Sequence, residues 1–252
     1  MLQVLVGVYM AVMGLLIGSF LNVCICRLPQ GRTVVRGRSM CMSCGHVIPW
    51  HDNIPLVSFV ALRGKCRFCG ARISPRYPLV EGLNAAVYLA AYLSMGLSAR
   101  MGLTCLSASA LIVAAFLDLD TRMVPDRISV FIAALGIVGL LVGREPPLWQ
   151  AVLGALVISA PMLILALALG GFGGADIKLS AACGLLLGLW QMLLAGLIAA
   201  LSAAALAGIG LASGKLSRKG AIPFVPALAA GVIVSGLFGP QIIAWYLGLF
   251  GL

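Results

Sequence analysis

The sequence predicts an all-α polytopic membrane protein. Of its 252 residues, 62% are hydrophobic and 10% are charged, with a mean hydropathy of +1.12. Soluble domains average about 45–50% apolar and about 25% charged residues. Apolar runs near the roughly 20 residues that cross a bilayer also recur along the chain. The composition therefore excludes a soluble globule and a disordered chain.

Eight apolar runs predict about eight transmembrane helices. Residues 2–23 carry no charge and form the first. No basic segment precedes them and no small-residue cleavage site follows, so we expect no cleaved signal peptide. The run 178–189 is short, and only a turn around Trp190 and Gln191 separates it from the next. The other six runs cover residues 79–98, 101–118, 128–143, 148–170, 190–212 and 223–250.

The net charge is +10, and the positions of the basic residues along the chain indicate its orientation in the membrane. With eight spans, fifteen of the seventeen basic residues fall on one side of the membrane, and Arg100 and Arg144 fall on the other. Lys and Arg are retained on the cytoplasmic side. This predicts that both termini lie outside and that residues 27–78 form a cytoplasmic loop; no nucleic-acid partner is expected. The fifteen are Arg27, Arg32, Arg36, Arg38, Arg63, Lys65, Arg67, Arg72, Arg76, Arg122, Arg127, Lys178, Lys215, Arg218 and Lys219.

Two CxxC pairs in this loop predict a structural Zn²⁺ site. Its four ligands would be Cys41, Cys44, Cys66 and Cys69. Two such pairs, each on a tight knuckle, can point four thiolates at one ion, and four thiolates leave no open position for a water nucleophile. A reducing cytoplasm disfavours disulfides. His46 and His51 lie close by, but a site closed by four sulfurs does not need them. The predicted organisation is a first transmembrane helix (1–26), a basic loop with the four-cysteine site (27–78) and a seven-helix membrane domain (79–252).

Acidic residues are scarce, and most of the seven fall in two short segments. One is LDLDTRMVPD, residues 117–126; the other is GGFGGADIKL, residues 170–179. Both lie at the predicted cytoplasmic ends of spans, where an ionisable group suggests function. Two carboxylates held together share a proton, so one can activate water while the other polarises a peptide carbonyl. This is aspartic-protease chemistry. Asp126, after Pro125, is interpreted as a helix N-cap.

Further motifs occur in a fixed order around these sites, and together they resemble the type IV prepilin leader peptidase family, of the GxGD class. They are GSFLNV (18–23), RLP (27–29), IPWHDNIP (48–55) and RYPLVE (76–81). The resemblance implies an eight-helix inner-membrane aspartic peptidase. Such an enzyme cuts the basic leader from type IV prepilins or type II secretion pseudopilins at the cytoplasmic face. It also implies methylation of the new N-terminal residue with S-adenosylmethionine.

The resemblance carries the catalytic aspartates over by position. The first lies seven residues before Pro125, which gives Asp118 and leaves Asp120 as its competitor; the second is Asp176. Ala175 replaces the glycine that directly precedes the second aspartate in the family. Alanine does not tolerate a positive φ, so this position tests whether glycine's freedom is needed. An aromatic residue is usual in the family where His51 stands.

The leading hypothesis is a prepilin peptidase that also has methyltransferase activity. Its substrate, which has a basic leader, would bind the protein directly or through membrane lipid. A transporter that uses Asp118 and Asp176 as a proton relay is the alternative from another class. A non-catalytic assembly scaffold is a third. The sequence has no glycine-rich nucleotide-binding fingerprint, so the methyl-donor site is implied by the resemblance alone, with Glu81 as a candidate residue.

Overall fold

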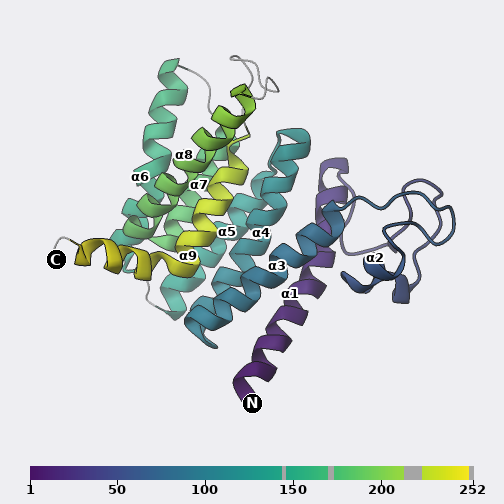
Figure 1. Cartoon of the computed structure of the whole chain (residues 1–252). Helices are drawn as coiled ribbons and strands as arrows, with labels where there is room; N and C mark the ends of the chain where they lie inside the picture. The colour runs from purple at the N-terminus through teal and green to yellow at the C-terminus, as the bar shows by residue number, and fades with distance from the viewer. Residues whose placement is uncertain (144–145, 170–172, 213–222, 250–252) are drawn as a thin grey trace. The chain divides into compact units, whose positions relative to one another are not determined.

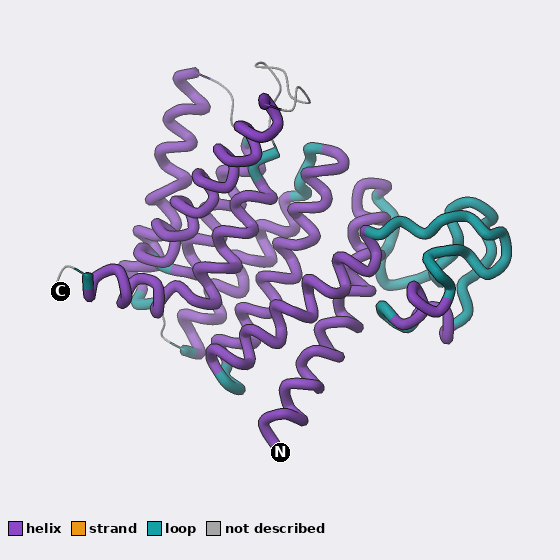
Figure 2. Tube along the Cα trace, viewed as in Figure 1, coloured by secondary structure: helices purple, strands orange, loops and turns teal. Residues whose placement is uncertain are grey.

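The protein is all-helical in the computed structural model, which describes residues 1–143, 146–169, 173–212 and 223–249. Five residues or segments discussed above lie outside the described residues: Arg144, Gly170–Phe172, Lys215, Arg218 and Lys219. The chain divides into two compact units, Met1–Leu93 and Ser94–Leu252. Figure 2 shows helices joined by loops throughout the described part.

A helix occupies each of the eight predicted segments. These helices are α1 (Leu2–Arg27), α3 (Arg76–Met95), α4 (Ala99–Thr121), α5 (Asp126–Val142), α6 (Leu148–Leu169), α7 (Gly174–Leu187), α8 (Leu189–Ala212) and α9 (Val225–Gly248). Within the described residues, α1, α4, α6, α8 and α9 are long and apolar enough to cross a membrane. The chain is therefore a multi-pass membrane protein. That α3, α5 and α7 also cross stays a prediction.

Local chemistry explains several helix ends. The Ser98 side chain accepts a hydrogen bond from the Met101 N–H and caps α4. Helix α5 follows Pro125, so Asp126 is its first residue and not its N-cap as predicted. The break between α7 and α8 also differs from the prediction. It falls at Gly188, with φ 79°, because that backbone conformation suits glycine, and Trp190 lies inside α8.

In the first unit, α1 packs closely on α3. The amide of Asn84, which is fully buried, donates to the Gly14 carbonyl at 2.8 Å. A Cβ at Gly14 would lie 2.6 Å from the Ala85 Cα, so only a glycine permits this approach. Between the two helices, the chain forms a loop that contains two 3₁₀ turns (Leu28–Gln30 and Trp50–Asn53) and the short helix α2 (Val57–Ala61).

The second unit is a bundle of α4 to α9, in which α9 packs on α4 and α8, and α7 on α5 and α6 (Figure 1). Its centre contains fully buried aliphatic side chains, among them Leu111, Ile132, Leu179 and Leu228. Because neighbouring helices alternate in direction, the end of α4 meets the starts of α7 and α9. The opposite end of the bundle holds a cavity of about 500 Å³, lined by Arg100, Gln150 and Gln191 among others.

Candidate functional site

Asp118 lies in the last turn of α4 and is buried, with 7% of its surface exposed. Its carboxylate accepts a hydrogen bond from the Val225 N–H at 3.2 Å. Val225 is the first residue of α9, and the N-terminus of a helix stabilises negative charge. Asp120, its competitor in the sequence, is exposed. Of the two, Asp118 is therefore the carboxylate built into the bundle.

Asp176 lies in the first turn of α7 and is half-buried. Its carboxylate accepts from the Gly173 N–H at 3.3 Å, which ties the side chain to the start of its own helix. It is also close enough to Asp118 for the two carboxylates to interact electrostatically. The structure thus places two aspartates that are 58 positions apart in the sequence at the same end of the bundle, within range of an electrostatic interaction.

Ala175 is the second residue of α7 and has helical backbone geometry. The described non-glycine residues with positive φ are Leu56, Arg63 and Arg122, so Ala175 is not strained. A helical position accepts alanine as readily as glycine. The replacement of the family glycine therefore leaves the backbone at Asp176 undisturbed.

A second contact joins the same two segments. Lys178 of α7 donates to the Asp126 carboxylate of α5 at 2.7 Å, and both side chains are about 60% exposed. The sequence did not predict this pair, because charge complementarity between residues far apart gives no local signal. It links the start of α5 to the start of α7 at the end of the bundle that carries Asp176.

The four predicted cysteines cluster as the spacing indicates. Their Sγ atoms all lie within 4.8 Å of one another, so the group could hold a metal ion. Each CxxC pair forms the same knuckle: the Gly45 N–H donates to the Cys41 carbonyl and the Gly70 N–H to the Cys66 carbonyl, both at 2.9 Å. Both glycines have φ 70°. Glycine adopts this conformation without strain, which explains its place after each pair.

The donor set fits a tetrahedral ion. Four sulfurs bound at about 2.3 Å would be separated by about 3.8 Å, and the Sγ atoms of Cys41 and Cys69 are 3.8 Å apart. The thiols are also electrostatically coupled. Backbone N–H groups of Cys44 and Ser43 lower the pKa of Cys41 to about 6. The pKa of Cys69 rises to about 11 despite a backbone hydrogen bond at Ala71, through burial and the neighbouring sulfurs. Four adjacent thiolates therefore need a cation to coexist.

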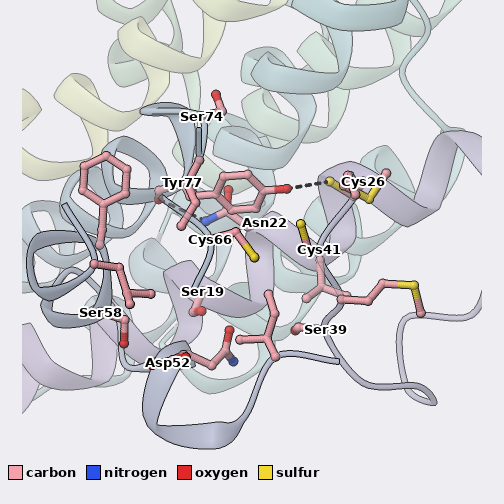
Figure 3. A pocket seen from close by; sticks show the side chains of 18 of the residues that line it. Ser19, Asn22, Cys26, Ser39, Cys41, Asp52, Ser58, Cys66, Ser74 and Tyr77 are labelled. Carbon is pink, nitrogen blue, oxygen red and sulfur yellow. Dashed lines mark hydrogen bonds between the residues drawn. The ribbon is translucent and has the colours of Figure 1, made fainter. Parts of the chain in front are cut away.

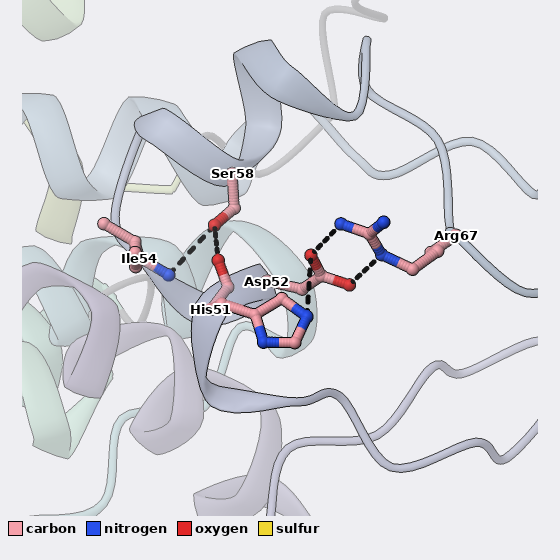
Figure 4. A network of polar contacts seen from close by, with 5 residues as sticks. All are labelled: His51, Asp52, Ile54, Ser58 and Arg67. Atoms are coloured by element: carbon pink, nitrogen blue, oxygen red, sulfur yellow. Dashed lines mark hydrogen bonds and ion pairs between the residues drawn. The ribbon is translucent and has the colours of Figure 1, made fainter.

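The two loop histidines have other contacts. His46 stacks on Phe68 with ring centroids 3.8 Å apart, and the His51 Nε2 lies 3.9 Å from Asp52. Within the described residues, neither joins the cysteine cluster. Asp52 also accepts two hydrogen bonds from Arg67, at 2.6 and 2.7 Å (Figure 4). Arg67 holds the pKa of the Asp52 carboxyl below its ordinary value. This pair links the segment after the first knuckle to the second knuckle.

Comparison with known proteins decides the family. The bacterial peptidase A24 N-terminal domain model matches residues 12–95, and the type IV leader peptidase family model matches residues 105–209. The chain belongs to the type IV leader peptidase family. Both aspartates fall within the second match and all four cysteines within the first.

Relatives in this family are similar over nearly the whole chain. A prepilin leader peptidase/N-methyltransferase of Bacillus subtilis is 33% identical, covering 94% of this chain and 96% of its own. Proteins of the same name from Stutzerimonas stutzeri and Pseudomonas aeruginosa are 37% and 35% identical, covering 94% and 95% of this chain and 92% of each relative. No solved structure matches significantly.

Proposed function

We propose that the protein is a membrane aspartic endopeptidase that removes the leader of type IV prepilins or type II secretion pseudopilins. It then N-methylates the new N-terminal residue, with S-adenosylmethionine as methyl donor. Asp118 and Asp176 are the catalytic pair. The observation that carries this assignment is that these two aspartates, from different helices, lie at one end of the bundle within range of each other's charge. The names of the relatives support both activities.

The surroundings of the two carboxylates suggest a division of labour. Asp118 accepts a hydrogen bond from the Val225 N–H at the start of α9, and such a bond to the charged form favours the carboxylate. It therefore serves as the base that takes a proton from the attacking water. Asp176, half-buried beside that charge, carries the shared proton and donates it to the peptide carbonyl oxygen. Collapse of the tetrahedral intermediate, with proton transfer to the leaving amine, completes the cleavage.

Cys41, Cys44, Cys66 and Cys69 bind one Zn²⁺ in this proposal, and the role of the metal is structural. The close packing of the four sulfurs and the absence of a fifth donor group in the described cluster support a closed site. Zinc would stabilise a loop that has little regular structure of its own. The chain is then organised as a first helix (1–26), the zinc loop (27–78) and a seven-helix domain (79–252).

We further propose a place for the protein in the bacterial inner membrane, with both termini outside and the active site facing the cytoplasm. The asymmetry of the basic residues supports this orientation. Partners are the prepilin or pseudopilin substrate and membrane lipid, with no nucleic acid. A transporter is not favoured, since the relatives named above are peptidase/methyltransferases.

Cleavage of a purified prepilin by membranes that contain the full-length protein tests the peptidase assignment. Asp118→Asn and Asp176→Asn should each abolish the shift in prepilin mass. Asp120→Asn is the matched control, because Asp120 lies two residues from Asp118 on the same helix but is exposed. It should cleave as the unmodified protein does. Normal cleavage by either of the first two variants would rule out the proposed pair.

A further inference from the structure

Large apolar side chains are exposed along one short stretch of the loop in the first unit. Trp50, in the second 3₁₀ turn, is 81% exposed, and Val57 and Val60 of α2 are 60% and 74% exposed. We call residues 50–61, which hold these side chains, the α2 segment. Single apolar residues are common on protein surfaces, but several in one short segment indicate a surface that contacts a partner.

The two sides of α2 have different surroundings. Ser58 is buried, and its hydroxyl donates to the His51 carbonyl and accepts from the Ile54 N–H, both at 3.0 Å (Figure 4). Val57 and Val60 are three positions apart and therefore share the other side of the helix. The loop's own hydrogen bonds thus hold one side of α2, while the other side is apolar and exposed.

The α2 segment lies beside α1, well before the end of that helix. The Leu56 N–H, just ahead of α2, donates to the Glu81 carboxylate of α3 at 2.8 Å. The Ser19 side chain of α1 also interacts with this carboxylate, and a Cβ at Gly18 would lie 2.7 Å from the Glu81 Cα. Glu81 therefore ties the start of α2 to the level of Gly18 and Ser19.

That level falls within the apolar part of α1. The predicted span covers residues 2–23, so Gly18 lies five residues, or about 7.5 Å, before its end at 1.5 Å per residue. Figure 3 shows Asn22 of α1 and Ser58 of α2 around one cavity of about 430 Å³, which is consistent with this level. Helices that lie in a membrane interface bury their apolar face about 5–10 Å into the boundary between headgroups and acyl chains. The α2 segment is therefore at the depth of this boundary.

Unbalanced positive charge follows the α2 segment. Arg63 and Lys65 are exposed, and neither forms an ion pair with a residue that the structure describes. Asp52, the only acidic residue between positions 27 and 78, is already paired with Arg67. The cytoplasmic leaflet has a negative surface potential, which attracts Lys and Arg next to the membrane. The charge of this surface is thus complementary to anionic lipid.

We infer that the α2 segment docks on the bilayer and binds anionic phospholipid. Trp50, Val57 and Val60 lie at the boundary between headgroups and acyl chains, and Arg63 and Lys65 bind lipid phosphates. The inference rests on the proposed membrane orientation and names the surface through which lipid meets the loop. A second protein could cover the apolar side chains, but it would have to bring its own anionic groups. Lipid phosphates already lie at this depth.

Photocrosslinking in the full-length protein identifies what covers this surface. In one variant p-benzoylphenylalanine replaces Val60, and in the matched control it replaces Val35, both in nanodiscs of phosphatidylglycerol and phosphatidylcholine. Val35 is 85% exposed in the same loop, but its segment is held at the end of α1, where the Arg27 side chain donates to the Thr33 and Arg36 carbonyls. Position 60 should form lipid adducts, identified by mass spectrometry, and position 35 should form few or none. Crosslinks from position 60 to residues 94–252 or to added prepilin, or equal lipid labelling at both positions, would overturn the inference.

A second measurement tests the recognition of charge. Each basic residue near an anionic surface favours docking about fivefold, so Arg63→Gln combined with Lys65→Gln should shift the ratio of docked to undocked segment about 30-fold. Lipid labelling at position 60 should therefore fall in nanodiscs that contain phosphatidylglycerol and change little in phosphatidylcholine alone. Unchanged labelling in both lipids would rule out binding of anionic lipid. Neither measurement depends on peptide cleavage, so failure of the peptidase assignment, seen as no cleavage of prepilin by the unmodified protein, is a separate result.

Discussion

Gly14 is the position at which the structure makes a sharp prediction about stability. A Cβ built there would lie 2.6 Å from the Ala85 Cα and 3.0 Å from the Asn84 carbonyl oxygen. Carbon atoms in contact prefer about 3.5–4.0 Å, so Gly14→Ala must push α1 and α3 apart by about 1 Å. The buried 2.8 Å hydrogen bond from Asn84 to the Gly14 carbonyl would then lengthen beyond bonding range.

The expected cost follows from these two effects. Overpacking costs about 1–3 kcal/mol and the lost hydrogen bond about 1 kcal/mol, while alanine regains up to about 1 kcal/mol in helix propensity. The net destabilisation is about 1–3 kcal/mol, or a fall in Tm of about 3–10 °C for a chain of this size. Thermal unfolding in detergent, followed by intrinsic fluorescence, measures it.

Two comparisons sharpen the test. Gly82→Ala, on α3, meets no atom within 4 Å and should leave Tm unchanged or slightly raised. Adding Ala85→Gly to Gly14→Ala should not restore stability, because the clash is with the backbone of Ala85 and not with its methyl group. Equal Tm values for Gly14→Ala and Gly82→Ala, or rescue by Ala85→Gly, would refute the close approach of α1 and α3.

Three further predictions concern the metal loop and the ion pairs. Removal of the metal by a chelator, or Cys66→Ser, should open residues 27–78 to trypsin while the helices stay protected; an unchanged digestion pattern would contradict a structural metal. The lowered pKa of Asp52 means that its ion pair stabilises the loop above the ordinary carboxyl pKa and is lost as the pH falls through the lower folded-state value. Unfolding measured from pH 7 to pH 3 should therefore show a smaller fall in stability for Asp52→Asn than for the unmodified protein. Equal falls in stability would count against the pair. Lys178→Ala, which removes an exposed partner of Asp126, should change the free energy of unfolding by less than about 1 kcal/mol, and a larger loss would show that the pair is not solvent-screened.

The predictions from the sequence that were confirmed rest on patterns among residues close together in the chain. The apolar runs located the helices because a span must be apolar over its whole length. The cysteine spacing located the four-cysteine cluster because a CxxC knuckle is set by a few neighbouring residues, ending in Gly45 or Gly70. Helix ends were harder. The N-cap assignment of Asp126 was wrong by one residue, and the turn expected at Trp190 falls at Gly188.

Contacts between distant segments left no such pattern. The Val225 N–H that binds Asp118 lies 107 residues away, and nothing about a valine signals a partner for a carboxylate. Likewise, RYPLVE identified Glu81 only as part of a motif, and the hydrogen bond that its carboxylate accepts from the Leu56 N–H forms only when α3 and the loop are folded together. Hydrophobic periodicity gives the position of a helix but not the identity of its neighbours.

The choice between Asp118 and Asp120 shows what a neighbour adds. Both residues belong to α4, which continues to Thr121, three residues beyond the predicted end of the span. Two positions along an α-helix are about 200° apart around its axis, so a helix that buries one of these carboxylates exposes the other. The sequence therefore shows that only one of the two carboxylates can be buried, but it does not show which one. The packing of α9 against α4 decides that Asp118 is the buried one, because the Val225 N–H at the start of α9 donates a hydrogen bond to its carboxylate. Loss of cleavage in Asp120→Asn with normal cleavage in Asp118→Asn would therefore contradict the packing of these two helices as well as the catalytic assignment.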